Sequence, residues 1–195
     1  GASVIDGHEA GHGFPFDSNG MKVRYPDVFF SQFTGAELVA DKWNLSRQDL
    51  DEFAFESHQK AAHATETKYF DREILPVEGK NAEGINDMVI ADEGIRFDAS
   101  LDKLAGLNPV TEGGVITAGN ASQITDGAAA VLICNDAGLK KIQSNPRAEI
   151  VSISVVGDDP VFMLTGPIPA SKKALEAAGL SIDEIDIYEV NEAFA

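Results

Sequence analysis

The sequence contains only one cysteine, Cys134, and no long apolar run. A single cysteine excludes a disulfide framework within the chain and is typical of a reducing compartment, so we expect a cytoplasmic protein. The longest apolar run, AAAVLIC at residues 128–134, is far too short to cross a bilayer. We therefore expect no membrane span.

Basic residues are also scarce. Lys and Arg number 15 against 32 Asp and Glu, which gives a formal net charge of −17. Nucleic-acid binding requires a basic surface, so this charge argues against a nucleic-acid partner. If the ligand is an anion, a few cations must be placed locally against the prevailing charge.

Histidine occurs four times, and two of the four belong to an HExxH pattern formed by His8, Glu9 and His12. That spacing binds zinc only on a helix, where both imidazoles share one face. Three glycines and a proline surround the two histidines and disfavour a helix. We therefore expect no metal site, and a metallopeptidase is the least favoured function. His58 and His63 are interpreted as surface or partner-contact residues.

Capping patterns and apolar periodicity predict several helices. TGAE at residues 34–37 and SRQD at residues 46–49 both have the form of helix starts, and the second opens a long helix to about residue 68. Gly179 is the expected C-cap of a helix over residues 169–178. The other predicted elements are an extended segment at residues 73–77, a loop or hairpin at 81–92, and a helix at 101–107.

Three apolar runs predict strands, at residues 128–134, 150–156 and 185–190. Their alternation with helices favours an α/β sheet with crossover connections. Cys134 ends the first run and is expected to be a buried strand cysteine. Asn191 follows the last run and can cap a helix that begins NEAFA. Because the chain stops where that helix starts, it is expected to be truncated.

Three stretches carry unusual residue combinations: TAGNASQITDGAAA at 117–130, GPIPA at 166–170 and NEAFA at 191–195. Small residues in the first allow the close approach of a ligand, but they also suit a tight turn into a buried strand. An amide such as Asn191 at the carboxyl end of a strand is a functional candidate or a helix cap. The residues alone leave these alternatives open.

Together and in this order, the three stretches resemble motifs of the thiolase family, and residues 34–64 resemble two helices of its loop domain. The resemblance implies an α/β fold, part of a thiolase-like fold with an inserted loop domain. It implies a loop domain at residues 1–122, the end of the N-terminal half at 123–145 and the start of the C-terminal half at 146–195. It also implies a homodimer or homotetramer.

Thiolases cleave 3-ketoacyl-CoA with free CoA, or run the reverse Claisen condensation, in fatty-acid and lipid metabolism. The resemblance implies acyl-CoA and CoA as substrates, no other cofactor, and a role for Asn191 in holding a water that stabilises the oxyanion. The other residues that the resemblance places at the substrate are Ser122 and Ala118 near pantetheine, Arg96 near the nucleotide, Met163 at the acyl pocket, and Ala193 and Phe194 lining the pocket.

The chain departs from the family pattern in two ways. Where many thiolases have a His-Met-Gly step, residues 31–33 read Ser-Gln-Phe. Thiolase turnover depends on a nucleophilic cysteine, a second cysteine and the histidine of a Gly-His-Pro motif. None of these three occurs in this sequence. The chain alone is therefore expected to be inactive and stable only in a larger assembly. The alternative is a non-catalytic thiolase-like protein that binds acyl-CoA or a partner.

Overall fold

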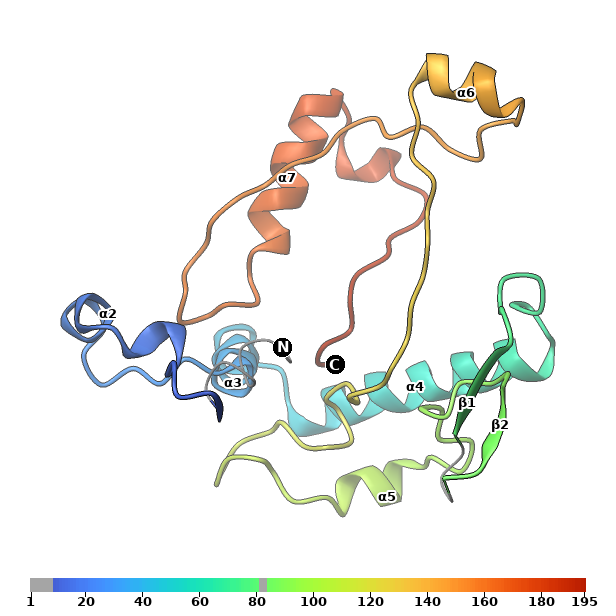
Figure 1. The fold of residues 1–195 in the computed structure, drawn as a ribbon. Helices are drawn as coiled ribbons and strands as arrows, with labels where there is room; N and C mark the ends of the chain where they lie inside the picture. Colours follow the sequence, from blue (N-terminus) through green and yellow to red (C-terminus); the bar gives the residue numbers. More distant parts are fainter. Residues whose placement is uncertain (1–8, 81–83) are drawn as a thin grey trace. The chain divides into compact units, whose positions relative to one another are not determined.

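A computed structural model describes residues 9–80 and 84–195, and they divide into two compact units (Figure 1). The first unit combines the chain up to Asn44 with residues 151–186, and the second combines residues 45–150 with residues 187–195. The described elements are η1 (Pro15–Asp17), α2 (Asn19–Arg24), α3 (Gln32–Trp43), α4 (Arg47–Glu66), β1 (Val77–Lys80), β2 (Asn86–Val89), α5 (Leu101–Ala105), α6 (Asp136–Ile142), α7 (Pro167–Ala178) and η2 (Ile182–Glu184).

Helix α3 organises the first unit. It begins two residues before the predicted TGAE box, because the hydroxyl of Ser31 accepts a hydrogen bond from the amide of Phe33 at 3.2 Å and so caps the helix. Gly35 lies inside the helix and faces the backbone of Phe162, so closely that an added Cβ would stand 2.5 Å from the carbonyl oxygen. The glycine therefore allows α3 to pack directly on the chain segment that leads to Met163.

Helix α7 belongs to the same unit. Pro167 occupies its first turn and Gly179, with φ of 71°, ends it, as the sequence predicts, although the helix begins two residues earlier than expected. Two side chains anchor it to the neighbouring extended segment: Ser154 Oγ donates to the carbonyl of Ala170 at 2.6 Å, and Lys173 Nζ donates to the carbonyl of Val155 at 3.1 Å.

The second unit is built on helix α4, which packs against α5. The predicted cap is confirmed: Ser46 and Asp49 form a reciprocal capping box, in which the Asp49 carboxylate accepts from the Ser46 amide at 2.7 Å. The buried apolar side chains of this unit are Leu50, Ala54, Leu104 and Ile116. A hairpin is present but begins earlier than the segment at 81–92 that was expected to be a loop or hairpin, because β1 and β2 pair antiparallel with Val77 opposite Val89.

The three predicted strands are not strands in this structure. Residues 128–134, 150–156 and 185–190 are extended, but no sheet partner accompanies any of them within the described part of the chain. Most of their apolar side chains are exposed; Val131, for example, is 85% accessible. A strand needs a neighbour to satisfy its backbone groups, so these runs have the composition of buried strands without the pairing that would make them so.

Two further expectations are corrected. Cys134 is exposed, because the run that it ends packs against no sheet. Helix α6 was not predicted, although Asn135 is a recognisable N-cap whose side chain accepts from the amide of Gly138 at 3.0 Å. Among the described residues, no helix has both the length and the apolar character needed to cross a membrane.

Candidate functional site

The first candidate motif, TAGN at residues 117–120, forms a turn whose first and last residues are buried. Thr117 and Asn120 are 0% and 2% exposed. The side-chain oxygen of Asn120 accepts from the amide of Thr117 at 2.7 Å, and the hydroxyl of Thr117 accepts from the amide of Gly119 at 3.1 Å. Gly119 packs closely on two leucines, since an added Cβ would lie 2.6 Å from the side-chain ends of both Leu104 and Leu107, which would have to move. The motif is therefore a rigid, closely packed turn.

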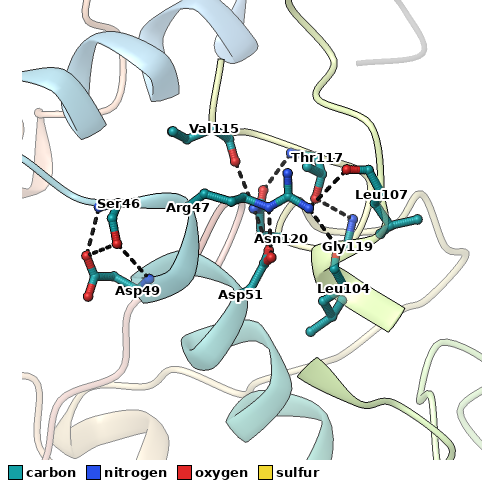
Figure 2. Close-up of polar contacts among 10 residues, drawn as sticks. All are labelled: Ser46, Arg47, Asp49, Asp51, Leu104, Leu107, Val115, Thr117, Gly119 and Asn120. Carbon is teal, nitrogen blue, oxygen red and sulfur yellow. Dashed lines mark hydrogen bonds and ion pairs between the residues drawn. The ribbon is translucent and has the colours of Figure 1, made fainter. Parts of the chain in front are cut away.

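A polar network connects this turn to helix α4 (Figure 2). The side-chain amide of Asn120 donates to Asp51 Oδ1 at 3.1 Å, and Arg47 Nε donates to Asp51 Oδ2 at 2.7 Å. The same guanidinium donates through Nη2 to the carbonyl of Leu104, in the last turn of α5, at 2.6 Å and to the carbonyl of Leu107, just beyond the helix, at 3.1 Å. Each buried polar group thus has a partner, which makes the network a strong restraint on the turn.

The third motif, NEAFA, lies alongside this turn. The backbone amide of Ser122 donates to the carbonyl of Ala193 at 2.9 Å, and the amide of Ala195 donates to the carbonyl of Asn120 at 2.9 Å. Residues 191–195 are therefore extended, and the prediction that Asn191 caps a helix is wrong. Bonding to the turn takes up the backbone groups that a helix would have used. Two motifs separated by about a third of the chain meet at one place.

A cleft of about 290 Å³ opens beside the two motifs. Helix α4 supplies one wall of the cleft through Ser57 and His58. Ser122 and Gln123, from the stretch that begins TAGN, also line the cleft. Glu192 also lines the cleft, and its Oε2 accepts from Ser57 Oγ at 2.7 Å. Among the residues predicted to contact substrate, Ser122 is the one that lines this cleft, whereas the lining side chains of α4 were not predicted.

The loop that carries Arg96 is tied to the same cleft. Gln123 Nε2 donates to the carbonyl of Gly94 at 2.7 Å, and the amide of Arg96 donates to His58 Nδ1 at 3.3 Å. His58 therefore has a contact within the chain that the surface interpretation did not include. The signal was present in the sequence, because His58 lies next to the apolar stripe of its helix.

A second cleft, of about 240 Å³, shares His58 with the first as a lining residue. Arg96 and His63 line it together with Glu66 and Phe97. His63 also meets the ring of Tyr69 edge-on, with ring centroids 5.9 Å apart. Arg96 is exposed, so its charge is available at the mouth of this cleft.

The remaining predicted site residues are distributed over both units. Ala193 and Phe194 are half-buried, and an antiparallel bridge pairs Phe194 with Ala121, whereas Asn191 and Ala118 are exposed. Met163 belongs to the first unit, is 41% exposed and has an unusual φ of 56°. Near it, the Thr165 hydroxyl, followed by the backbone, holds the pKa of the Asp158 carboxyl below its ordinary value.

The HExxH pattern falls partly outside the described residues, because His8 is not among them. Gly11 and Gly13, on either side of His12, have φ of 84° and 70°, so no helix continues through His12. Within residues 9–80 and 84–195, no three His, Cys, Asp or Glu side chains are grouped closely enough to hold a metal ion.

The chain matches two family models in sequence order. Residues 19–137 match the thiolase N-terminal domain, and residues 144–195 match the thiolase C-terminal domain. A steroid 3-ketoacyl-CoA thiolase of Mycobacterium tuberculosis is 47% identical over 94% of this chain and 44% of its own length. A 3-ketoacyl-CoA thiolase of Yersinia pestis is 46% identical over 82% of this chain and 42% of its own length.

Solved structures give the same result. Human mitochondrial 3-ketoacyl-CoA thiolase superposes with a TM-score of 0.78 and 41% identity, over 83% of this chain and 41% of that one. Acetyl-CoA acetyltransferase of Bacillus anthracis superposes with a TM-score of 0.80 and 37% identity, over 87% of this chain and 43% of that one. The chain thus spans less than half the length of the relatives that it matches, and its fold is the α/β fold of thiolases. It belongs to the thiolase family.

Proposed function

We propose that the complete protein containing these 195 residues is a thiolase, which cleaves 3-ketoacyl-CoA with free CoA or runs the reverse condensation. Its relatives bear the names 3-ketoacyl-CoA thiolase and acetyl-CoA acetyltransferase. The observation that carries the proposal is the pairing of Ser122 with Ala193, because it brings two family motifs to the edge of one cleft.

The proposed chemistry requires donors that face a thioester oxygen as negative charge develops on it. We assign to Asn191 the role of holding a water that donates to this oxygen. Ser122 and Ala118 are assigned to the pantetheine, and Ala193 and Phe194 to the pocket wall. A soft, unbranched side chain suits the acyl pocket, and we assign Met163 to it.

Arg96 is assigned to the anionic end of CoA. The chain as a whole carries a net charge of −17, so a phosphate ligand needs a locally placed cation. Arg96 is exposed at the second cleft and meets this requirement. Coenzyme A is in this proposal a substrate or product, and no further cofactor is required.

The nucleophile and the acid/base groups are not assigned to these residues. Acyl transfer through a covalent intermediate needs an activated thiolate. Cys134 follows the run at 128–134 and lies outside the three motifs, so we exclude it as the nucleophile. We propose that the 195 residues by themselves do not catalyse acyl transfer.

We further propose the division into a loop domain at residues 1–122, the end of one thiolase half at 123–145 and the start of the next at 146–195. A cytoplasmic homodimer or homotetramer, acting in fatty-acid metabolism, completes the proposal.

The experiment is an assay of the complete protein with acetoacetyl-CoA and with a longer 3-ketoacyl-CoA, each with free CoA. We expect turnover, and we expect Asn191→Ala to lower kcat by about 100-fold, because an oxyanion donor is lost. Cys134→Ser is the matched control and should leave kcat unchanged. Binding of acyl-CoA without turnover would instead identify a non-catalytic thiolase-like protein.

A further inference from the structure

Three side chains of helix α4 reach three of the segments that carry candidate site residues. Asp51 accepts from Asn120 in the TAGN turn, Ser57 donates to Glu192 in NEAFA, and His58 accepts from the amide of Arg96. Asp51 and His58 are seven residues apart, about two helical turns, and so lie on the same face. One rigid helix thus positions segments that are far apart in the sequence.

The contact of Ser57 lies at the Asn191 end of NEAFA. The backbone hydrogen bonds of this motif to the turn involve Ala193 and Ala195 and leave the first two residues of the motif unbonded to it. The 2.7 Å bond from Ser57 Oγ to Glu192 Oε2 restrains the residue next to Asn191. Without this bond, the backbone at Asn191 gains freedom while the rest of the motif stays in place.

The contact of His58 acts on a different segment. Its Nδ1 accepts from the amide of Arg96 at 3.3 Å, and the Gln123 side chain holds the carbonyl of Gly94 two residues earlier. His58 lines both the motif cleft and the cleft that Arg96 lines. If the Nδ1 acceptor of His58 is lost, the loop that carries Arg96 loses this restraint and keeps the hydrogen bond from Gln123 to Gly94.

We propose that Ser57 and His58 are positioning residues with separate tasks, Ser57 placing Asn191 for acyl transfer and His58 placing Arg96 for the anionic end of CoA. The inference rests on the proposed thiolase function. It predicts that two adjacent residues of one helix affect different kinetic constants, a separation that a common loss of stability would not produce.

The test measures kcat and the KM for CoA of the complete protein in the thiolytic direction. We expect Ser57→Ala to lower kcat by about tenfold, because small misplacements of a reacting group reduce the rate strongly, and to change KM less than twofold, within about 0.4 kcal/mol. We expect His58→Leu to raise KM by about tenfold, equivalent to one hydrogen bond of about 1.4 kcal/mol, with kcat unchanged.

Conservative variants supply the controls. Ser57→Thr keeps the hydroxyl and should restore kcat, and His58→Asn keeps an acceptor at the position of Nδ1 and should restore KM. Glu192→Leu removes the Ser57 bond from its other side and must reproduce the kcat loss; it also serves if Ser57→Ala fails to fold. Glu52→Gln, at an exposed position of the same helix, should change neither constant.

The outcomes are distinct. An unmodified protein without thiolase activity refutes the proposed function itself. If that protein is active and the Ser57 and His58 variants change the same constant, or neither constant, the separate positioning tasks are refuted while the thiolase assignment stands.

Discussion

The side-chain amide of Asn120 donates to the carboxylate of Asp51 at 3.1 Å, across 69 residues of sequence (Figure 2). Asp51 also accepts from Arg47, and its side chain is 6% exposed. This carboxylate therefore joins the start of helix α4 to the turn that supports NEAFA. Because a buried carboxylate must obtain its hydrogen bonds from the protein, Asp51 closely determines the positions of Arg47 and Asn120.

Removal of this carboxylate should destabilise the protein strongly. We expect Asp51→Ala to lower the free energy of unfolding by about 3–5 kcal/mol, because Arg47 is left without its charge partner in a largely buried place. Urea unfolding measures the change. The matched control is Glu56→Ala, which breaks an exposed pair with Lys60 at 3.4 Å and should cost less than about 1 kcal/mol. Equal losses in the two variants would contradict the network.

Two glycine-to-alanine substitutions in the first unit should have opposite signs. Gly35→Ala places a Cβ 2.5 Å from the backbone oxygen of Phe162, which cannot rotate away, so we expect a loss of about 1–3 kcal/mol. Gly20→Ala, in helix α2, meets nothing within 4 Å and should stabilise by about 0.5–1 kcal/mol. Thermal unfolding compares them. A neutral Gly35→Ala would mean that α3 does not pack on this segment.

The capping box of α4 should contribute to the loss of stability in acid. The Ser46 hydroxyl, followed by its backbone amide, lowers the pKa of the Asp49 carboxyl below its ordinary value. A lowered carboxyl pKa stabilises the fold above the unfolded-state pKa, and this contribution is lost as the pH falls through the folded-state pKa.

The cap is tested by titration of the side-chain carboxyl carbons by NMR. We expect Ser46→Ala to raise the pKa of Asp49 towards its ordinary value. Asp98 is the internal control, because Lys103 lowers its pKa and the substitution should not move it. An unchanged Asp49 pKa would show that the cap is not formed in solution.

The HExxH pattern should not bind zinc. We expect the purified protein to contain less than stoichiometric zinc by elemental analysis, and His12→Ala to leave the metal content unchanged, because Gly11 and Gly13 prevent a continuous helix. Stoichiometric zinc that disappears in His12→Ala would refute this expectation.

Local sequence was sufficient to predict several elements of the fold. Helix α4 begins at the expected cap, α7 ends at Gly179, and the second strand of the hairpin lies within the segment expected to be a loop or hairpin. These features depend on residues close together in the chain, so pattern and propensity determine them. The start of α3 was missed, because Ser31 and the Thr34 box both offer a cap and the upstream hydroxyl is the one used.

The predicted strands show the limit of such patterns. Apolar runs at residues 128–134, 150–156 and 185–190 have the composition of strands. A strand also requires a neighbouring strand that pairs with it in register through backbone hydrogen bonds. NEAFA illustrates the same point, since it has a plausible cap in Asn191 and yet is extended along the TAGN turn.

By itself the sequence determined the family, through three motifs in order, and the helix ends, through capping residues and glycine. The tertiary structure decided which motifs meet. Ser122 pairs with Ala193, Asp51 holds Asn120, and Ser57 reaches Glu192 across 135 residues. Such contacts depend on how helices and turns pack, and no local pattern specifies which of many compatible hydrogen-bond partners will be brought within reach.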